Sequence, residues 1–195
     1  GRVDDPGDRM IIGNTTPRYS YSFRIEASWN GFDISAFFQG VGKRDWYPTA
    51  NKDDIYGANQ FWQLYGYTIP SFITYDFMDH VWSEDNPNGY FPRLRPIQSY
   101  NGGPLGQNND RYLQSVAYLR FKNLTIGYTL PVLKKYFSKL RLYVSGENLC
   151  YWSPLKKYCK LIDPELAISS ATYRGGTGTG YTMPRTFSFG VDITF

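Results

Sequence analysis

The sequence predicts an all-β chain whose antiparallel strands form part of a transmembrane β-barrel. Large apolar side chains alternate with small or polar ones through the last nine residues and in four earlier segments, so each predicted strand has two unlike faces. Short and long connections also alternate between these segments, as they do in outer-membrane barrels. One sheet of a soluble β-sandwich would show the same alternation, and it is the alternative interpretation.

The last strand is predicted over residues 181–195. Its apolar side ends on the aromatic residue Phe195. The pattern polar-x-Gly-x-x-apolar-x-aromatic resembles the C-terminal signal by which bacterial outer-membrane barrels are recognised for assembly. In this chain the signal consists of Ser188, Gly190, Ile193 and Phe195. We therefore expect outer-membrane lipid and the assembly machinery among the partners of this strand.

A β-hairpin is predicted from strands at residues 17–29 and 32–42. The two segments flank Asn30-Gly31, the preferred pair for a two-residue type I′ turn. Such a turn places Trp29 opposite Phe32 and, six residues further along each strand, Phe23 opposite Phe38. Every cross-strand pair on that face is apolar, so the turn and the alternation predict the same register.

Two more strands are predicted at residues 111–130 and 140–151. In the first, the apolar residues change phase at Lys122-Asn123, which indicates a β-bulge. The connections at 30–31 and 131–139 are short, whereas those at 43–110 and 153–180 are long. On a barrel the long ones would be outer loops, and Phe195 would lie on the periplasmic side.

The composition excludes several other classes of protein. The chain has 195 residues, of which 18% are aromatic, and its mean hydropathy is −0.46. No run of apolar residues is long enough for a transmembrane helix. The net charge of +4 comes from scattered basic residues, so no nucleic-acid partner is predicted.

The single histidine, His80, and the cysteines Cys150 and Cys159 form no set of metal ligands, and we predict no cofactor. For the two cysteines, a disulfide and two free thiols both stay open.

The polar side of the predicted strands carries charged and amide residues that would line a barrel lumen. Since a polar lumen accounts for Arg24 beside Glu26, no catalytic residue is predicted and the chain is not expected to be an enzyme. The predicted lumen-facing residues are Arg24, Glu26, Asp33, Gln39, Arg141, Glu147 and Asp192.

The long outer loops are rich in aromatic residues. Packing within the loop is the first expectation for them, contact with a partner protein the second, and contact with a ligand the third. The candidate residues for ligand or partner contact are Trp46, Tyr47, Trp62, Tyr65, Trp82 and Tyr90.

Several stretches resemble SusC/RagA-type TonB-dependent transporters of Bacteroidetes, in the order that family has them. The resemblance covers nearly the whole chain and includes the terminal strand. The stretches are DRMIIGN at 8–14 followed by PRY at 17–19, GFDISAFFQGVG at 31–42, YLRFKNLTIGY at 118–128, VSGENL at 144–149 and PRTFSFG at 184–190.

This resemblance implies the C-terminal part of a barrel of about 22 strands, of which five lie here. It implies TonB-dependent import of a nutrient oligomer, a glycan first and a peptide second, together with a SusD-like surface lipoprotein. The plug domain and the region that contacts TonB would lie upstream, outside this chain. A passive outer-membrane channel and a soluble carbohydrate-binding β-sandwich module are the alternative functions.

Overall fold

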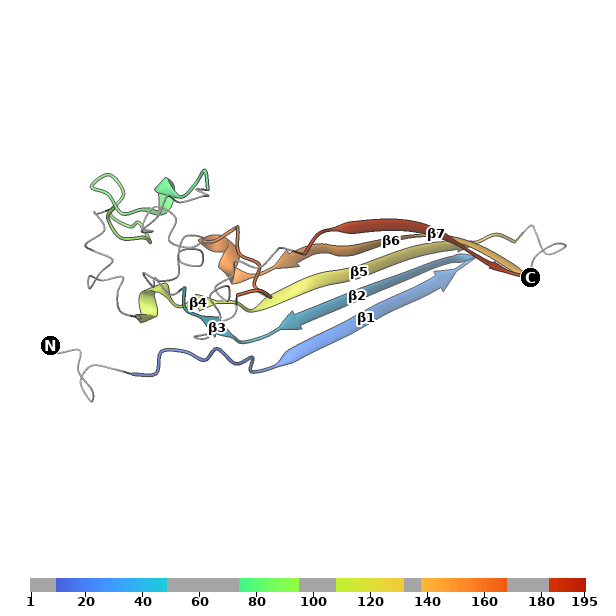
Figure 1. The fold of residues 1–195 in the computed structure, drawn as a ribbon, viewed down its shortest axis with the longest axis horizontal. Helices are drawn as coiled ribbons and strands as arrows, with labels where there is room; N and C mark the ends of the chain where they lie inside the picture. Colours follow the sequence, from blue (N-terminus) through green and yellow to red (C-terminus); the bar gives the residue numbers. More distant parts are fainter. Residues whose placement is uncertain (1–9, 49–73, 95–107, 132–137, 168–182) are drawn as a thin grey trace. The chain divides into compact units, whose positions relative to one another are not determined.

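The computed structural model describes residues 10–48, 74–94, 108–131, 138–167 and 183–195 (Figure 1). The chain divides into two compact units. The strand unit comprises Arg18–Gly42, Ala117–Ser153 and Thr182–Phe195. The loop unit comprises Gly1–Pro17, Lys43–Val116 and Pro154–Tyr181.

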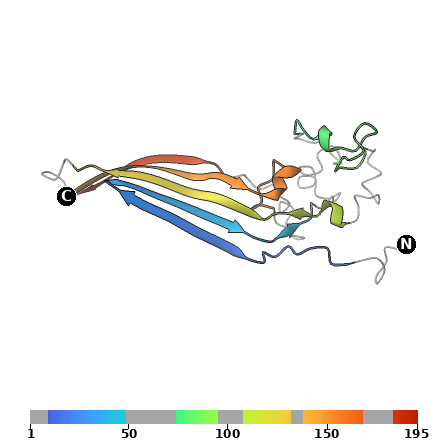
Figure 2. The same cartoon turned by 180° about the vertical axis from the view of Figure 1, so that it is seen from behind.

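The strand unit is a single antiparallel sheet of five long strands, seen from opposite sides in Figures 1 and 2. Its order is β1-β2-β5-β6-β7, so each strand lies beside the next long strand in the sequence. The strands are β1 (Ser20–Trp29), β2 (Phe32–Val41), β5 (Tyr118–Thr129), β6 (Lys139–Trp152) and β7 (Thr186–Thr194).

The loop unit has only short regular elements among its described residues. Two-residue strands β3 (Asp45–Trp46) and β4 (Gln114–Ser115) pair with each other. The 3-10 turns are η2 (Met78–His80), η4 (Asp110–Tyr112) and η5 (Pro154–Lys157). No helix among the described residues combines the length and the apolar character needed to cross a membrane.

Some strand limits differ from those predicted. The strand expected over 111–130 begins only at Tyr118, because η4 and β4 occupy the residues before it. The last strand begins at Thr186 and not at 181. Pro184 precedes it, and proline has no N–H to donate to the ladder.

The predicted hairpin has the predicted register. Asn30 and Gly31 both have positive φ angles, 47° and 85°, as a type I′ turn requires. Trp29 pairs with Phe32 and Phe23 pairs with Phe38. The turn type and the apolar pairs therefore act together, as expected from the sequence.

The predicted bulge also lies where the sequence indicates. The pairing of β5 with β6 shifts register between Phe121 and Asn123, with Lys122 as the intervening residue. Opposite the shift, Asn148 of β6 adopts a φ of 51°, and its side-chain amide donates to the Pro184 carbonyl at 3.3 Å. The bulge keeps the apolar residues before and after it on one side of the sheet.

The hydrophobic core of the chain's described part lies mainly in the loop unit. Trp46, Phe77 and Phe91 are fully buried there, and the rings of Phe77 and Phe91 are 5.0 Å apart. Tyr90 stacks on Tyr158 at 3.7 Å beside this core. The strand unit, in contrast, leaves most of its large apolar side chains exposed.

Candidate functional site

One side of the five-stranded sheet, here called the apolar face, carries mainly large apolar side chains, many of which are exposed. Trp29 is 80% exposed, Phe187 74% and Phe189 88%. Phe38 stacks between Phe23 and Phe121, with ring centroids 4.8 and 4.5 Å apart. By register this face also carries Ile25, Phe32, Ile34, Leu124, Ile126, Tyr128, Leu140, Leu142, Val144, Val191 and Ile193.

Such an apolar face is not expected to be exposed to water in the assembled protein. Patches of exposed apolar surface beyond a few hundred Å² mark contacts with protein or membrane. The strands run for 9 to 14 residues, and a tilted transmembrane strand needs about 9 to 11. The sheet therefore has the length and the outer surface of a membrane-spanning barrel wall.

The opposite side of the sheet, the polar face, brings together the seven residues expected to face a lumen. Register places Glu26 opposite Ser35 and Arg141 opposite Asp192. Each of the other predicted residues lies an even number of positions from one of these four on the same strand. Because successive side chains of a strand point to opposite sides, an even spacing places them on the same face. The seven are Arg24, Glu26, Asp33, Gln39, Arg141, Glu147 and Asp192.

Three of these seven form a network across the sheet, which we call the Arg141 clasp. The Arg141 guanidinium on β6 donates to Asp33 on β2 from Nε at 2.9 Å and from a terminal nitrogen at 2.6 Å. Its other terminal nitrogen donates to Asp192 on β7 at 2.9 Å. The side chain crosses β5 at Gly127, where a Cβ atom would lie 2.5 Å from Arg141 Nε. Glycine at this position thus makes room for the clasp.

The Arg24–Glu26 pair is much looser. One guanidinium nitrogen lies 3.5 Å from the Glu26 carboxylate, and the Ser35 hydroxyl donates to the same carboxylate at 3.2 Å. Both charged side chains are exposed. An exposed pair of this kind contributes little to stability.

The polar face also carries aromatic residues that the sequence reasoning missed. The Arg24 guanidinium lies 5.6 Å from the Phe37 ring, and Arg141 lies 5.0 Å from Tyr143. Arg120 is buried and lies 4.8 Å from the Tyr151 ring. For two of these aromatics a signal was available at a polar position of the two-residue period: Phe37 is opposite Arg24 in the hairpin register, and Tyr143 is two residues after Arg141.

Three of the candidate loop aromatics pack within the loop unit: Trp46, Tyr47 and Tyr90. Packing within the loop was the first expectation for these residues. Trp46 and Tyr47 are buried. The Tyr90 hydroxyl donates to the Arg111 carbonyl and accepts from the Gln114 amide, each at 2.7 Å. Burial raises the pKa of Tyr90 to about 12. The candidates Trp62 and Tyr65 lie outside the described residues.

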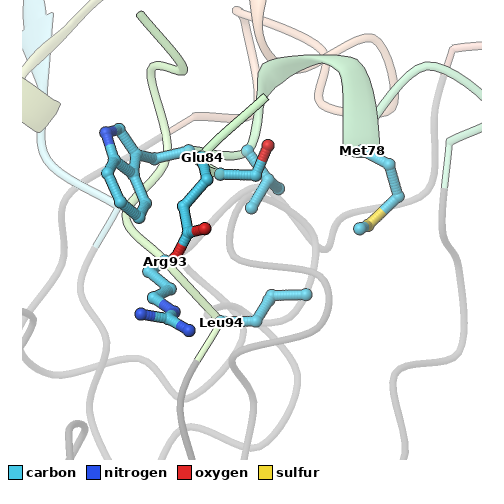
Figure 3. A pocket seen from close by; sticks show the side chains of 7 residues that line it. Met78, Glu84, Arg93 and Leu94 are labelled. Carbon is cyan, nitrogen blue, oxygen red and sulfur yellow. The ribbon is translucent and has the colours of Figure 1, made fainter. Parts of the chain in front are cut away.

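Trp82 is placed differently from these packed aromatics. It lines a cavity of about 460 Å³ together with Met78, Val81, Ser83, Glu84, Arg93 and Leu94 (Figure 3). It is the one described member of the candidate set that borders this cavity.

The two cysteines are both thiols. Cys150 lies on β6 of the strand unit, and Cys159 is buried in the loop unit. Burial raises the pKa of Cys159 to about 11, so its thiol is protonated at neutral pH. Within the described residues no group of three or more His, Cys, Asp or Glu side chains could hold a metal ion.

An open sheet of membrane-length strands, apolar on one side and charged on the other, defines a segment of an outer-membrane β-barrel wall. No protein-family model matches the chain. It is 30% identical over 198 aligned residues to TonB-dependent receptor P3 of Formosa agariphila; the match covers 96% of this chain and 17% of that receptor. The chain thus spans a small part of the relative's length.

Solved structures share the fold. A chain of the RagAB peptide importer in its closed-closed state matches with a TM-score of 0.58 and 20% identity, over 100% of this chain and 20% of that one. The open-open state matches with a TM-score of 0.53 and 20% identity, over 95% and 18%. The chain belongs to the TonB-dependent receptors, and its place is the bacterial outer membrane.

Proposed function

We propose that this chain forms one arc of the wall of a TonB-dependent transporter that imports a nutrient oligomer across the outer membrane. The two-sided sheet of membrane-length strands is the observation that supports this most strongly. Five strands cannot close a barrel, since the smallest barrels have about eight. The other strands, the plug and the segment that contacts TonB would come from the rest of the receptor.

In this role the two faces of the sheet contact different surroundings. The apolar face contacts lipid, where each unpaired backbone amide would cost several kcal/mol, so β1 and β7 need further strands at their open edges. The polar face, with the Arg141 clasp, lines the lumen or contacts the plug. Because Arg141 is already bound by two carboxylates, we propose that it braces the wall and does not bind the substrate.

The substrate and the partner are the finer parts of the proposal. The structurally similar RagAB is described as a peptide importer, which supports an oligomer as cargo. The expectation of a glycan rests on the family resemblance of the sequence. A SusD-like surface lipoprotein as partner rests on the same resemblance. The chain contributes wall and loop to transport, and we assign it no enzymatic step.

A passive channel is the competing function, since it needs the same wall but neither TonB nor a lipoprotein. The test is uptake by cells that produce the full-length receptor, compared with cells in which the receptor gene is deleted. We expect uptake of the cargo to require the receptor and to stop when TonB is absent or the proton gradient is collapsed. Uptake that continues at the same rate without TonB would establish a passive channel. Affinity purification of the receptor should recover a surface lipoprotein.

A further inference from the structure

The loop unit contains a cavity that the barrel-wall role does not use. Its volume of about 460 Å³ falls in the range of small-molecule sites, roughly 300 to 1,000 Å³. It would hold one large side chain with its flanking groups, not a whole oligomer. All its lining residues fall between residues 78 and 94.

Hydrogen bonds of the backbone and of the Asn86 side chain set the shape of this segment. Trp82 N donates to the Phe91 carbonyl at 2.9 Å, and Phe91 N donates to the His80 carbonyl at 2.9 Å. The Asn86 side-chain amide donates to the carbonyls of Asp79, at 2.9 Å, and Val81, at 3.1 Å. A preformed site loses little conformational entropy when it binds.

Part of the cavity wall is apolar and partly exposed. Met78 is 53% exposed and Leu94 is 36% exposed, beside the buried Val81. Met78 lies across the cavity from Glu84 and Arg93 (Figure 3). Methionine is flexible and polarizable, and surfaces that accept varied apolar groups use it often. These walls suit a large aliphatic side chain.

The remaining lining includes two side chains of opposite charge. Neither Glu84 nor Arg93 forms a hydrogen bond or an ion pair with another described residue. A carboxylate accepts hydrogen bonds from amide or ammonium groups, and a guanidinium donates to carbonyl or carboxylate oxygens. A peptide carries both kinds of group on either side of an apolar side chain. A neutral oligosaccharide carries no charge and no aliphatic side chain.

We infer that this cavity is a recognition site for a peptide segment with a large aliphatic side chain. That side chain enters between Met78 and Leu94, while Glu84 and Arg93 bind the flanking peptide groups. The inference rests on the proposed import function and names the chemical class of its cargo. It assigns no ligand contact to Trp46, Tyr47 or Tyr90, which pack within the loop unit.

The test measures binding to the full-length receptor in detergent by isothermal titration calorimetry. The probes are Gly-Gly-Leu-Gly-Gly, Gly-Gly-Ser-Gly-Gly and maltopentaose. We expect the leucine peptide to bind best, and the Met78→Ala/Leu94→Ala double variant to bind it about tenfold more weakly. Glu84→Gln and Arg93→Gln should each weaken binding about threefold to tenfold. The matched control Asp85→Asn removes an exposed neighbouring charge outside the cavity and should stay within about twofold.

Three results would overturn the inference: equal binding of the serine peptide, cavity variants that bind the leucine peptide as the parent does, or cavity-dependent binding of maltopentaose alone. Each variant is first checked for the heat-dependent gel mobility of a folded barrel. TonB-dependent uptake is measured separately in cells. If uptake depends on TonB but the peptide results fail, only the cavity assignment is wrong. If the peptide results hold but uptake does not depend on TonB, the transporter proposal is wrong.

Discussion

The strictest mutational test of the two faces places arginine at each of two adjacent positions of β7, one variant at a time. Phe189 and Ser188 are neighbours in sequence but lie on opposite sides of the sheet, because side chains alternate along a strand. Phe189 is on the apolar face and is 88% exposed. Arginine at that position would place a charge in lipid, whereas arginine at Ser188 would lie on the polar face.

The expected sizes follow from the place of Phe189 in its strand. It stands three residues from Thr186 and five from Thr194, near the middle of the crossing. An arginine on the lipid side of a barrel costs about 2 to 4 kcal/mol at the bilayer midplane and about 0 to 1 near its edges. We therefore expect Phe189→Arg to lower the free energy of unfolding by about 2 to 4 kcal/mol. Ser188→Arg should lower it by less than about 1 kcal/mol.

The assay is denaturant unfolding of the full-length receptor in liposomes, followed by the gel mobility of the folded barrel. Both variants add the same charge to the same strand, so general effects on assembly cancel in the comparison. Equal losses in the two variants, or a larger loss for Ser188→Arg, would refute the assignment of the two faces.

Further predictions concern the clasp, the turn and the loop unit. Arg141→Gln should lower the temperature at which the folded mobility on gels is lost. The matched Arg24→Gln, which removes an exposed pair and a contact with the Phe37 ring, should lower it less; equal behaviour would contradict the clasp. Gly31→Ala should destabilise the barrel by about 1 kcal/mol in the same denaturant assay, since Gly31 has φ 85° and a Cβ would meet the Thr129 carbonyl at 2.9 Å. The hydrogen bond from Lys160 to Asp76, at 2.5 Å, lowers the pKa of that carboxyl below its ordinary 3.8, so its stabilisation is present above pH 3.8 and is lost as the pH falls through the lowered value. The melting temperatures of the parent and Asp76→Asn should therefore differ at pH 6 and converge in acid, and a constant difference would contradict this assignment.

Sequence patterns predicted the features that depend on neighbouring residues. The hairpin register follows from Asn30-Gly31 and the alternation around it, and both act over a few residues. The bulge was visible because one inserted residue, Lys122, changes the phase of the apolar positions. Such signals need no knowledge of the rest of the fold.

Features that join distant segments could not be predicted in this way. The clasp joins Arg141 to Asp33, 108 residues away, and depends on Gly127 to let the side chain cross β5. The two-residue strands β3 and β4 are too short to show a period. Tyr90 and Trp82 look alike in the sequence as loop aromatics. Tyr90 stacks on Tyr158 beside the core, whereas Trp82 borders a cavity, because tertiary packing decides burial.

The orientation of the sheet in the membrane can be measured most directly with spin labels at residues 187–193 of β7, one at a time, in the full-length receptor reconstituted into liposomes. Relaxation by oxygen, which concentrates in hydrocarbon, is compared with relaxation by a water-soluble nickel complex. The account predicts a period of two, with oxygen dominant at Phe187, Phe189, Val191 and Ile193 and reduced at Ser188, Gly190 and Asp192. A profile without that period, or labels at the phenylalanine positions shielded from both reagents, would show that protein and not lipid covers the apolar face.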